Sequence, residues 1–191
     1  MRTRISILFP LLLASATQAT VTLTCQDLGG YVAELSYDAS EEASLVRAFA
    51  LDVTVSNGII SSIGNLSTDY WVYLGSIGPG PQDTPVVPPG SPGALGGLGT
   101  SGMTIHMASL YIENDPVHNT PPPAGGVLFT FTISAECDVT VTENVLRGGV
   151  VLEDFTQPGI YAPPCHIVPE PASLALLGLG AAMLLKKRRT F

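Results

Sequence analysis

The sequence predicts an all-β protein whose main part is a single β-sandwich or jelly-roll-like domain of about eight or nine strands. Two observations indicate this fold class. Short segments alternate between apolar and polar residues with a period of two, and 20 glycines and 16 prolines divide the chain at short intervals. In addition, no window of ten or more residues in the middle of the chain shows an apolar 3.6-residue period. Many short alternating strands separated by turns are typical of sandwiches and barrels.

The alternation is clear at 31–37, 49–55, 103–107, 127–133 and 137–141. Glycine-containing turns connect some of the expected strands. In chain order these strands are 21–25, 31–37, 49–55, 59–63, 103–107, 110–112, 127–133, 137–141 and 150–155. Asn57 and Gly58 both tolerate positive φ, so they predict a two-residue hairpin leading into 59–63. Gly148 and Gly149 are expected to turn the chain into the last strand.

The first nineteen residues have the composition of a secretory signal peptide. Arg2 and Arg4 form a basic start, residues 5–14 are an apolar stretch, and small residues end the segment at Ala19. Pro10 disfavours the alternative of a buried first helix. We therefore expect residues 1–19 to be removed on export and residues 20–168 to form the sandwich domain.

The C-terminal end combines a short apolar run with a cluster of cations. Residues 172–185 are expected to form a short apolar helix, which at about 1.5 Å per residue spans about 21 Å against a hydrocarbon core of about 30 Å. Four cations follow it: Lys186, Lys187, Arg188 and Arg189. The run is thus marginal as a permanent transmembrane helix, and the positive-inside rule places both chain ends in the cytoplasm and the middle outside.

The end of the chain resembles a known sorting signal. Pro169-Glu170-Pro171, the apolar run and the basic end occur in the order of the PEP-CTERM protein-sorting signal of bacteria. The resemblance implies that residues 169–191 hold the exported protein transiently in the inner membrane. It also implies that an exosortase, a transpeptidase-like cysteine protease, cuts near the Pro-Glu-Pro motif and passes the protein to the cell surface or the extracellular matrix.

The expected domain is strongly acidic. Residues 20–168 contain two arginines, no lysine and fifteen carboxylates, which gives a formal net charge of −13. This charge repels phosphate backbones and excludes nucleic acid as a partner. A solvated acidic surface is the simplest interpretation, and attraction of divalent cations or basic partners is the alternative.

Two long Gly- and Pro-rich loops, 75–102 and 113–126, contain or adjoin the candidate binding residues. Tyr70, Trp71 and Tyr73 precede the first loop and are candidates for stacking on sugar rings, although they could equally fill the core. Glu113 and Asp115 are candidate oxygen ligands for calcium, and an acidic turn explains them as well.

The sequence offers no catalytic motif. GxSxG, HExxH and phosphate-loop patterns are absent. The three histidines, His106, His118 and His166, are far apart in the sequence and are expected to lie at the surface. No cofactor other than calcium is expected, and the protein is predicted not to be an enzyme.

Three cysteines in an exported protein allow one disulfide and leave one thiol. The expected turn at Gly148 and Gly149 favours Cys137 with Cys165, because the chain would then fold back toward Cys137. Cys25 with Cys165 is the second choice, since first and last strands often lie together.

Two function classes remain. The first is an exported surface or extracellular-matrix protein whose non-catalytic sandwich binds exopolysaccharide or other surface proteins. The second is an extracellular carbohydrate-active hydrolase that uses a carboxylate acid/base pair. The order of the early and late strand pairs also resembles cohesin-like bacterial sandwiches, although the chain lacks the Asp-x-Asn-x-Asp repeat of a dockerin. Signal peptidase and exosortase are the partners expected during export.

Overall fold

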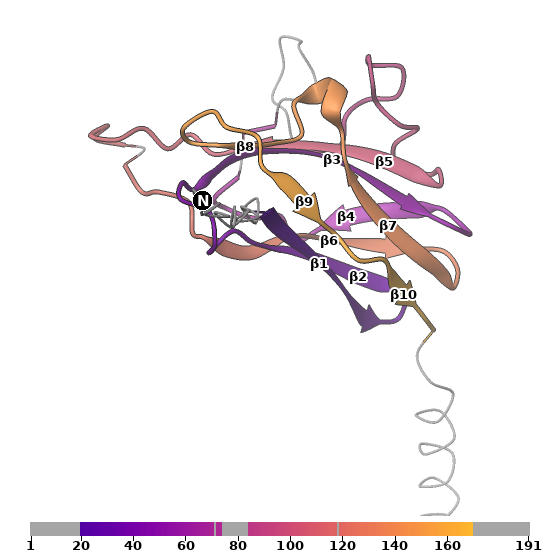
Figure 1. The fold of residues 1–191 in the computed structure, drawn as a ribbon. Helices are drawn as coiled ribbons and strands as arrows, with labels where there is room; N and C mark the ends of the chain where they lie inside the picture. The colour runs from indigo at the N-terminus through magenta and orange to yellow at the C-terminus, as the bar shows by residue number, and fades with distance from the viewer. Residues whose placement is uncertain (1–19, 71, 74–83, 118, 170–191) are drawn as a thin grey trace, which may run out of the picture.

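The computed structural model describes residues 20–70, 72–73, 84–117 and 119–169, and they form two β-sheets packed face to face (Figure 1). The first sheet has the order β4-β6-β2-β1-β9, and the second has the order β10-β7-β3-β5 with β8 also paired to β3. The strands are β1 (Thr20–Gly29), β2 (Val32–Asp38), β3 (Val46–Val55), β4 (Ile60–Gly64), β5 (Gly102–Ala108), β6 (Gly125–Ile133), β7 (Cys137–Glu143), β8 (Val150–Leu152), β9 (Gly159–Tyr161) and β10 (Cys165–Ile167). The predicted all-β sandwich is confirmed.

The core lies between the sheets and is built from the inward positions of the alternating strands. In β7, Cys137, Val139 and Val141 are buried while the residues between them are exposed, as the period of two requires. Three aromatic rings fill one end of the core: Phe49 lies edge-on to Tyr37 and Tyr70, with ring centroids 5.1 and 5.0 Å apart. Edge-to-face pairs of this kind add to the stabilisation from burial itself.

The predicted hairpin at Asn57 and Gly58 is wrong, although the turn exists. Gly58 does adopt a positive φ of 75°. However, β3 belongs to the second sheet and β4 pairs with β6 in the first, so the turn carries the chain from one sheet to the other. Asn57-Gly58 specifies the local backbone, whereas the apolar faces of the two sheets determine which strand β4 joins.

The segment around Gly148 and Gly149 also differs from the expectation. A short 3-10 helix, η1 (Val145–Arg147), precedes these glycines, and the strand that follows, β8, pairs with β3. No hairpin therefore places residues near 159 opposite Cys137. Instead, β9 pairs in parallel with β1, and β10 pairs with β7.

Several expected segments lie outside the described residues: the signal peptide at 1–19, Trp71, His118, part of the first long loop at 74–83, and residues 170–191 with the apolar run and its basic end. Within the described ranges, no helix has the length and apolarity needed to cross a membrane.

Candidate functional site

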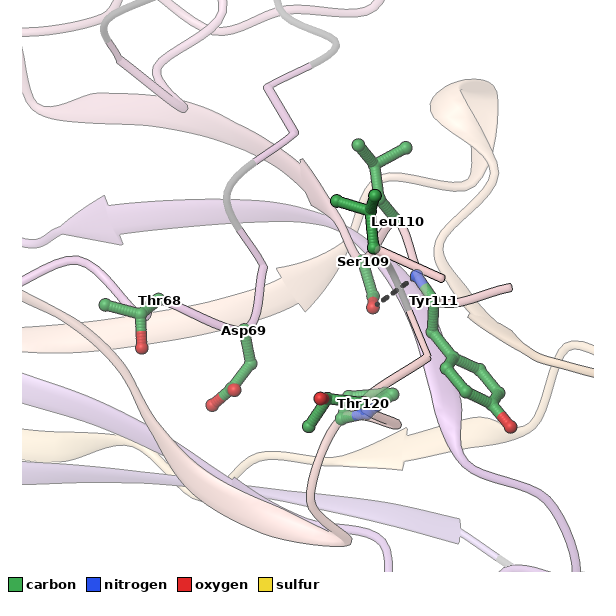
Figure 2. Close-up of a pocket in the computed structure, with 8 residues that line it drawn as sticks. Thr68, Asp69, Ser109, Leu110, Tyr111 and Thr120 are labelled. Atoms are coloured by element: carbon green, nitrogen blue, oxygen red, sulfur yellow. Dashed lines mark hydrogen bonds between the residues drawn. The ribbon is translucent and has the colours of Figure 1, made fainter. Parts of the chain in front are cut away.

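A surface pocket of about 380 Å³ lies at one end of the sandwich, between the segments that follow β4 and β5 and the loop that leads into β6 (Figure 2). Eight described residues line it: Thr68, Asp69, Ser109, Leu110, Tyr111, Val117, Thr120 and Pro122. They come from three segments that are distant in the sequence. The pocket therefore exists only in the folded domain.

Backbone hydrogen bonds hold two of the pocket walls. The N–H of Ser67 donates to the carbonyl of Leu128 in β6 at 2.8 Å, which fixes the start of the first wall. Val72 and Ala108 exchange two backbone hydrogen bonds of 3.0 and 2.8 Å, so the end of the same segment is bound to β5. The N–H of Ser109 donates to the carbonyl of Arg47 at 2.8 Å and fixes the second wall.

The third wall is attached to the aromatic end of the core. The hydroxyl of Tyr37 donates to the carbonyl of Pro123, and it lies 3.0 Å from the hydroxyl of Tyr70. Tyr70 in turn donates to the carbonyl of Val46 at 2.9 Å. Burial raises the pKa of both tyrosines, so these hydroxyls are neutral donors at physiological pH. Pro122, next to Pro123, is itself buried.

The pocket presents hydroxyl groups and one carboxylate. Thr68, Asp69 and Thr120 are exposed, and Figure 2 shows the side chains of Asp69 and Thr120 on facing walls. Ser109 is largely buried, and its hydroxyl accepts a hydrogen bond from the N–H of Tyr111 at 3.1 Å, which leaves its own proton available to donate. Among the described lining residues, Asp69 supplies the one carboxylate. The arrangement can bind a polar ligand, but the described lining offers no second carboxylate for acid/base chemistry.

The predicted sugar-stacking residues do not form an exposed platform. Tyr70 is 0 % exposed, and its ring packs against Tyr37 and Phe49, so the interpretation of Tyr70 as a stacking residue is wrong. Tyr73 is half-buried and packs against the core. Trp71 lies outside the described residues. The alternative that this aromatic segment fills the core thus holds for Tyr70.

The two calcium candidates lie in a turn of the loop between β5 and β6. Glu113 is exposed, whereas a carboxylate oxygen of Asp115 accepts a hydrogen bond from the N–H of Val117 at 2.8 Å. Within the described residues, no group of three or more His, Cys, Asp or Glu side chains could hold a metal ion. Calcium binding at Glu113 and Asp115 stays a prediction.

The disulfide joins Cys25 to Cys165, with the two Cα atoms 5.7 Å apart, and Cys137 is a buried free thiol. The first-choice prediction of Cys137 with Cys165 is therefore wrong, and the second choice is the pairing observed. The physical reason is the register: in the antiparallel pair of β7 and β10, Cys165 lies opposite Val139, while Cys137 lies opposite Ile167. Cys25 faces β10 from the other sheet, so the disulfide joins the two sheets.

Further contacts hold β10 immediately before the C-terminal segment. Ile167 is 0 % exposed, and the N–H of Val168 donates to a carboxylate oxygen of Asp27 at 3.1 Å. His166 is exposed, as predicted, and lies between two carboxylates: its Nδ1 is 2.8 Å from Asp138 and its Nε2 is 3.4 Å from Glu136. The hydrogen bond with Asp138 raises the pKa of His166 most, and Glu136 adds to the effect. The chain is thus fixed up to Val168.

A polar network anchors the other long loop to the second sheet. The side-chain amide of Asn144 donates to both carboxylate oxygens of Asp52, at 3.0 and 3.2 Å, and to the carbonyl of Gly93. Arg147 donates to the carbonyl of Pro92 at 3.0 Å and lies 3.4 Å from a ring nitrogen of His106.

His106 is half-buried, which departs from the surface position expected for it. Burial lowers the pKa of His106, and the neighbouring Arg147 lowers it further. His106 is therefore neutral at physiological pH. Arg147 contacts both His106 and the carbonyl of Pro92 in the long loop before β5, so this histidine belongs to the structural network rather than to the pocket.

Sequence reasoning missed the pocket residues Thr68, Ser109 and Thr120. Each is a common polar residue in or beside a loop, and no motif relates them. The signal in the sequence is the length of the loop at 113–126, since long loops often carry function, and this loop supplies Val117, Thr120 and Pro122.

Similarity to known proteins is found among solved structures and in one protein-family model. No curated protein sequence matches this chain. Two solved structures are similar: a chain of the crystal structure of a complex between a CaDoc0917 variant and CaCohA2, and the solution structure of CaCohA2 from Clostridium acetobutylicum. The first has 15 % sequence identity and a TM-score of 0.46, and covers 78 % of this chain and 99 % of that chain. The second has 16 % sequence identity and a TM-score of 0.45, and the alignment covers 80 % of this chain and 92 % of that chain.

The fold class rests on the strand pairing described above rather than on these two likenesses. At the C-terminal end, residues 168–189 match the family model of the PEP-CTERM protein-sorting motif. The match begins at Val168, directly after β10. The chain therefore carries a PEP-CTERM protein-sorting motif behind an all-β sandwich.

Proposed function

We propose that this protein is exported, anchored transiently by its C-terminal segment, cut near Pro169-Glu170-Pro171 by an exosortase, and delivered to the cell surface or the extracellular matrix. The observation that carries the proposal is the PEP-CTERM motif in residues 168–189. The basic and apolar composition of residues 1–19 supports removal by signal peptidase. In this proposal residues 20–168 are the part that functions outside the cell.

The position of β10 supports processing close to the folded domain. Ile167 is the last core residue, and the apolar run begins at Ala172. Five residues of extended chain reach at most about 17 Å. A protease that cuts between these positions therefore acts beside the sandwich, so the end of the sandwich that carries β10 faces the membrane until release.

The exported domain acts as a non-catalytic binding module that interacts with exopolysaccharide. Its pocket is lined mainly by hydroxyl and apolar side chains, a composition suited to binding a sugar rather than to cleaving one. A glycosidase needs two carboxyl groups within about 5 to 10 Å of each other. Asp69 is the one carboxylate in the described lining, so no specific observation favours the hydrolase.

Cell fractionation tests the sorting claim. The triple variant Pro169→Ala, Glu170→Ala, Pro171→Ala is compared with wild type and with the matched control Pro121→Ala, which changes an exposed proline in a loop. We expect the triple variant to remain in the membrane fraction while wild type and control are released. Mass spectrometry of the released protein then gives both termini. Unchanged release of the triple variant contradicts the proposal.

A further inference from the structure

The carboxylate of the pocket, Asp69, has no counter-charge among the residues that the structure describes. Asp69 accepts no side-chain hydrogen bond and makes no ion pair with the described residues. The two arginines of the domain are engaged elsewhere: Arg47 pairs with Glu153 at 2.7 Å, and Arg147 binds the carbonyl of Pro92. A ligand group that donates to this carboxylate would therefore meet no competing cation among the described residues.

The electrostatic field of the domain adds to this local preference. Residues 20–168 carry two arginines against fifteen carboxylates, a formal net charge of −13. Such a field raises the local concentration of cations and repels anions. A polymer of uronic acids or sulfated sugars is therefore disfavoured at the pocket, whereas an ammonium group is attracted by both the field and Asp69.

Hydroxyl groups surround the carboxylate and indicate the rest of the ligand. The side-chain hydroxyls of Thr68 and Thr120 make no hydrogen bond with the described residues, and Ser109 keeps its proton free to donate. Hydroxyl oxygens can both donate and accept, so they match the hydroxyls of a sugar ring. A lysine side chain would satisfy Asp69 but would leave these groups without partners.

The pocket is preformed and has a suitable size. Ser67 is hydrogen-bonded to β6, Ser109 is hydrogen-bonded to β3, and Tyr37 is hydrogen-bonded to Pro123 in the third wall. The walls are therefore already held in place, and a ligand needs to order little of the chain when it binds. At about 380 Å³ it lies at the lower end of the range of small-molecule sites, which run from about 300 to 1,000 Å³. A cavity of this volume suits a ligand of one or two sugar units better than it suits the broad surface of a protein partner.

We propose that this pocket binds an amino-sugar unit of an extracellular polysaccharide, with the ammonium group on Asp69 and the ring hydroxyls on Thr68, Ser109 and Thr120. The inference rests on the proposed extracellular function for the source of the ligand. The binding itself is a property of the domain and can be measured whether or not the protein is sorted.

Titration calorimetry with three probes of equal length tests the proposal: glucosamine hexamer, cellohexaose and hexaguluronate. The protein is purified as it occurs, from the medium if released or from membranes in detergent if retained. We expect the glucosamine hexamer to bind most tightly, cellohexaose at least about tenfold more weakly, and hexaguluronate not at all. A charge-assisted hydrogen bond of about 1.5 to 3 kcal/mol corresponds to about a ten- to hundredfold change in Kd.

Two variants and two controls locate the site. Asp69→Asn should weaken glucosamine-hexamer binding by about ten- to hundredfold, and Thr120→Val should weaken it several-fold. The matched controls Glu41→Gln and Thr142→Val change exposed residues away from the pocket and should leave Kd unchanged. Equal binding of cellohexaose would overturn the role of the ammonium group.

Two further outcomes would also overturn the proposal. Hexalysine is a fourth probe that carries ammonium groups without sugar hydroxyls, and equally tight binding of it would contradict the role of the hydroxyls. Unchanged binding by Asp69→Asn would contradict the site itself. Unfolding curves of each variant, measured in parallel, separate loss of binding from loss of fold. Membrane retention of wild type would instead count against the proposed function and leave the binding result standing.

Discussion

Removal of the disulfide between Cys25 and Cys165 should destabilise the domain strongly. The two cysteines are 140 residues apart in the sequence, and the bond closes nearly the whole described chain into a loop. Loop-closure entropy for this separation gives about 5 kcal/mol as an upper value, and measured disulfides typically contribute about 2 to 4 kcal/mol. Because β10 is only three residues long, its pairing with β7, the buried side chain of Ile167 and the hydrogen bond from Val168 to Asp27 would replace this constraint only in part.

Urea unfolding of the double variant Cys25→Ser, Cys165→Ser measures the effect. Changing both cysteines avoids a thiol that could exchange with the free thiol of Cys137. With a slope of about 2 kcal/mol per molar urea, a loss of about 2 to 4 kcal/mol lowers the unfolding midpoint by about 1 to 2 M. Pulse proteolysis should show cleavage near β10 before the rest of the domain unfolds.

The control is Cys137→Ala, which removes the buried free thiol and leaves the disulfide in place. This variant should lower the free energy of unfolding by only about 1 kcal/mol, because it removes one small buried side chain. A double variant with an unchanged midpoint would refute the stabilising role of the disulfide. Non-reducing peptide mapping that found Cys137 crosslinked to Cys165 would refute the pairing itself.

Two smaller perturbations test other contacts. Asn144→Ala should lower the free energy of unfolding by about 1 to 3 kcal/mol, because the carbonyl of Gly93 loses this donor and Asp52 keeps only the hydroxyl of Thr104. The exposed amide variant Asn57→Ala is the control, and equal midpoints for the two variants in urea would contradict the network. The neighbouring carboxylates raise the pKa of His166 in the folded protein, so its stabilisation of β10 is complete below the unfolded value of about 6.5 and is lost as pH rises through the folded value. NMR titration should give a pKa above 6.5 for His166, His166→Gln should remove this part of the pH dependence, and a pKa at or below 6.5 would contradict the ion pairs.

The fold class could be predicted from the sequence because burial between two sheets imposes a period of two on each strand. β6 and β7 show this clearly, with every second residue buried from Phe129 to Ile133 and from Cys137 to Val141. β9 and β10 could not be predicted, because three residues flanked by prolines carry too little pattern. The partner of β4 was missed because a turn sequence specifies backbone angles and not the strand that is paired.

The pocket could not be predicted for a related reason. Asp69, Ser109 and Thr120 meet through strand pairing over long sequence distances, and no local pattern relates them. The error in the disulfide has the same origin, since the expected hairpin at Gly148 and Gly149 does not form and β8 pairs with β3 instead. By contrast, the sorting motif is read from contiguous residues and needs no tertiary structure to be identified.

The location of the pocket relative to the C-terminal segment connects the two proposals. Ala108 precedes the pocket residue Ser109 and pairs with Ala48 near the start of β3. At the other end of β3, Val55 pairs with Val139, which in turn lies opposite Cys165 in β10. Seven residues of β3 separate these ends, which is about 23 Å of strand (Figure 1). A domain held at β10 would thus present its pocket on the side away from the membrane, where an extracellular polymer is accessible before the anchor is cut. Binding by membrane-retained protein in the triple variant of the Pro-Glu-Pro motif should therefore equal that of the released form, and weaker binding by the retained form would contradict this orientation.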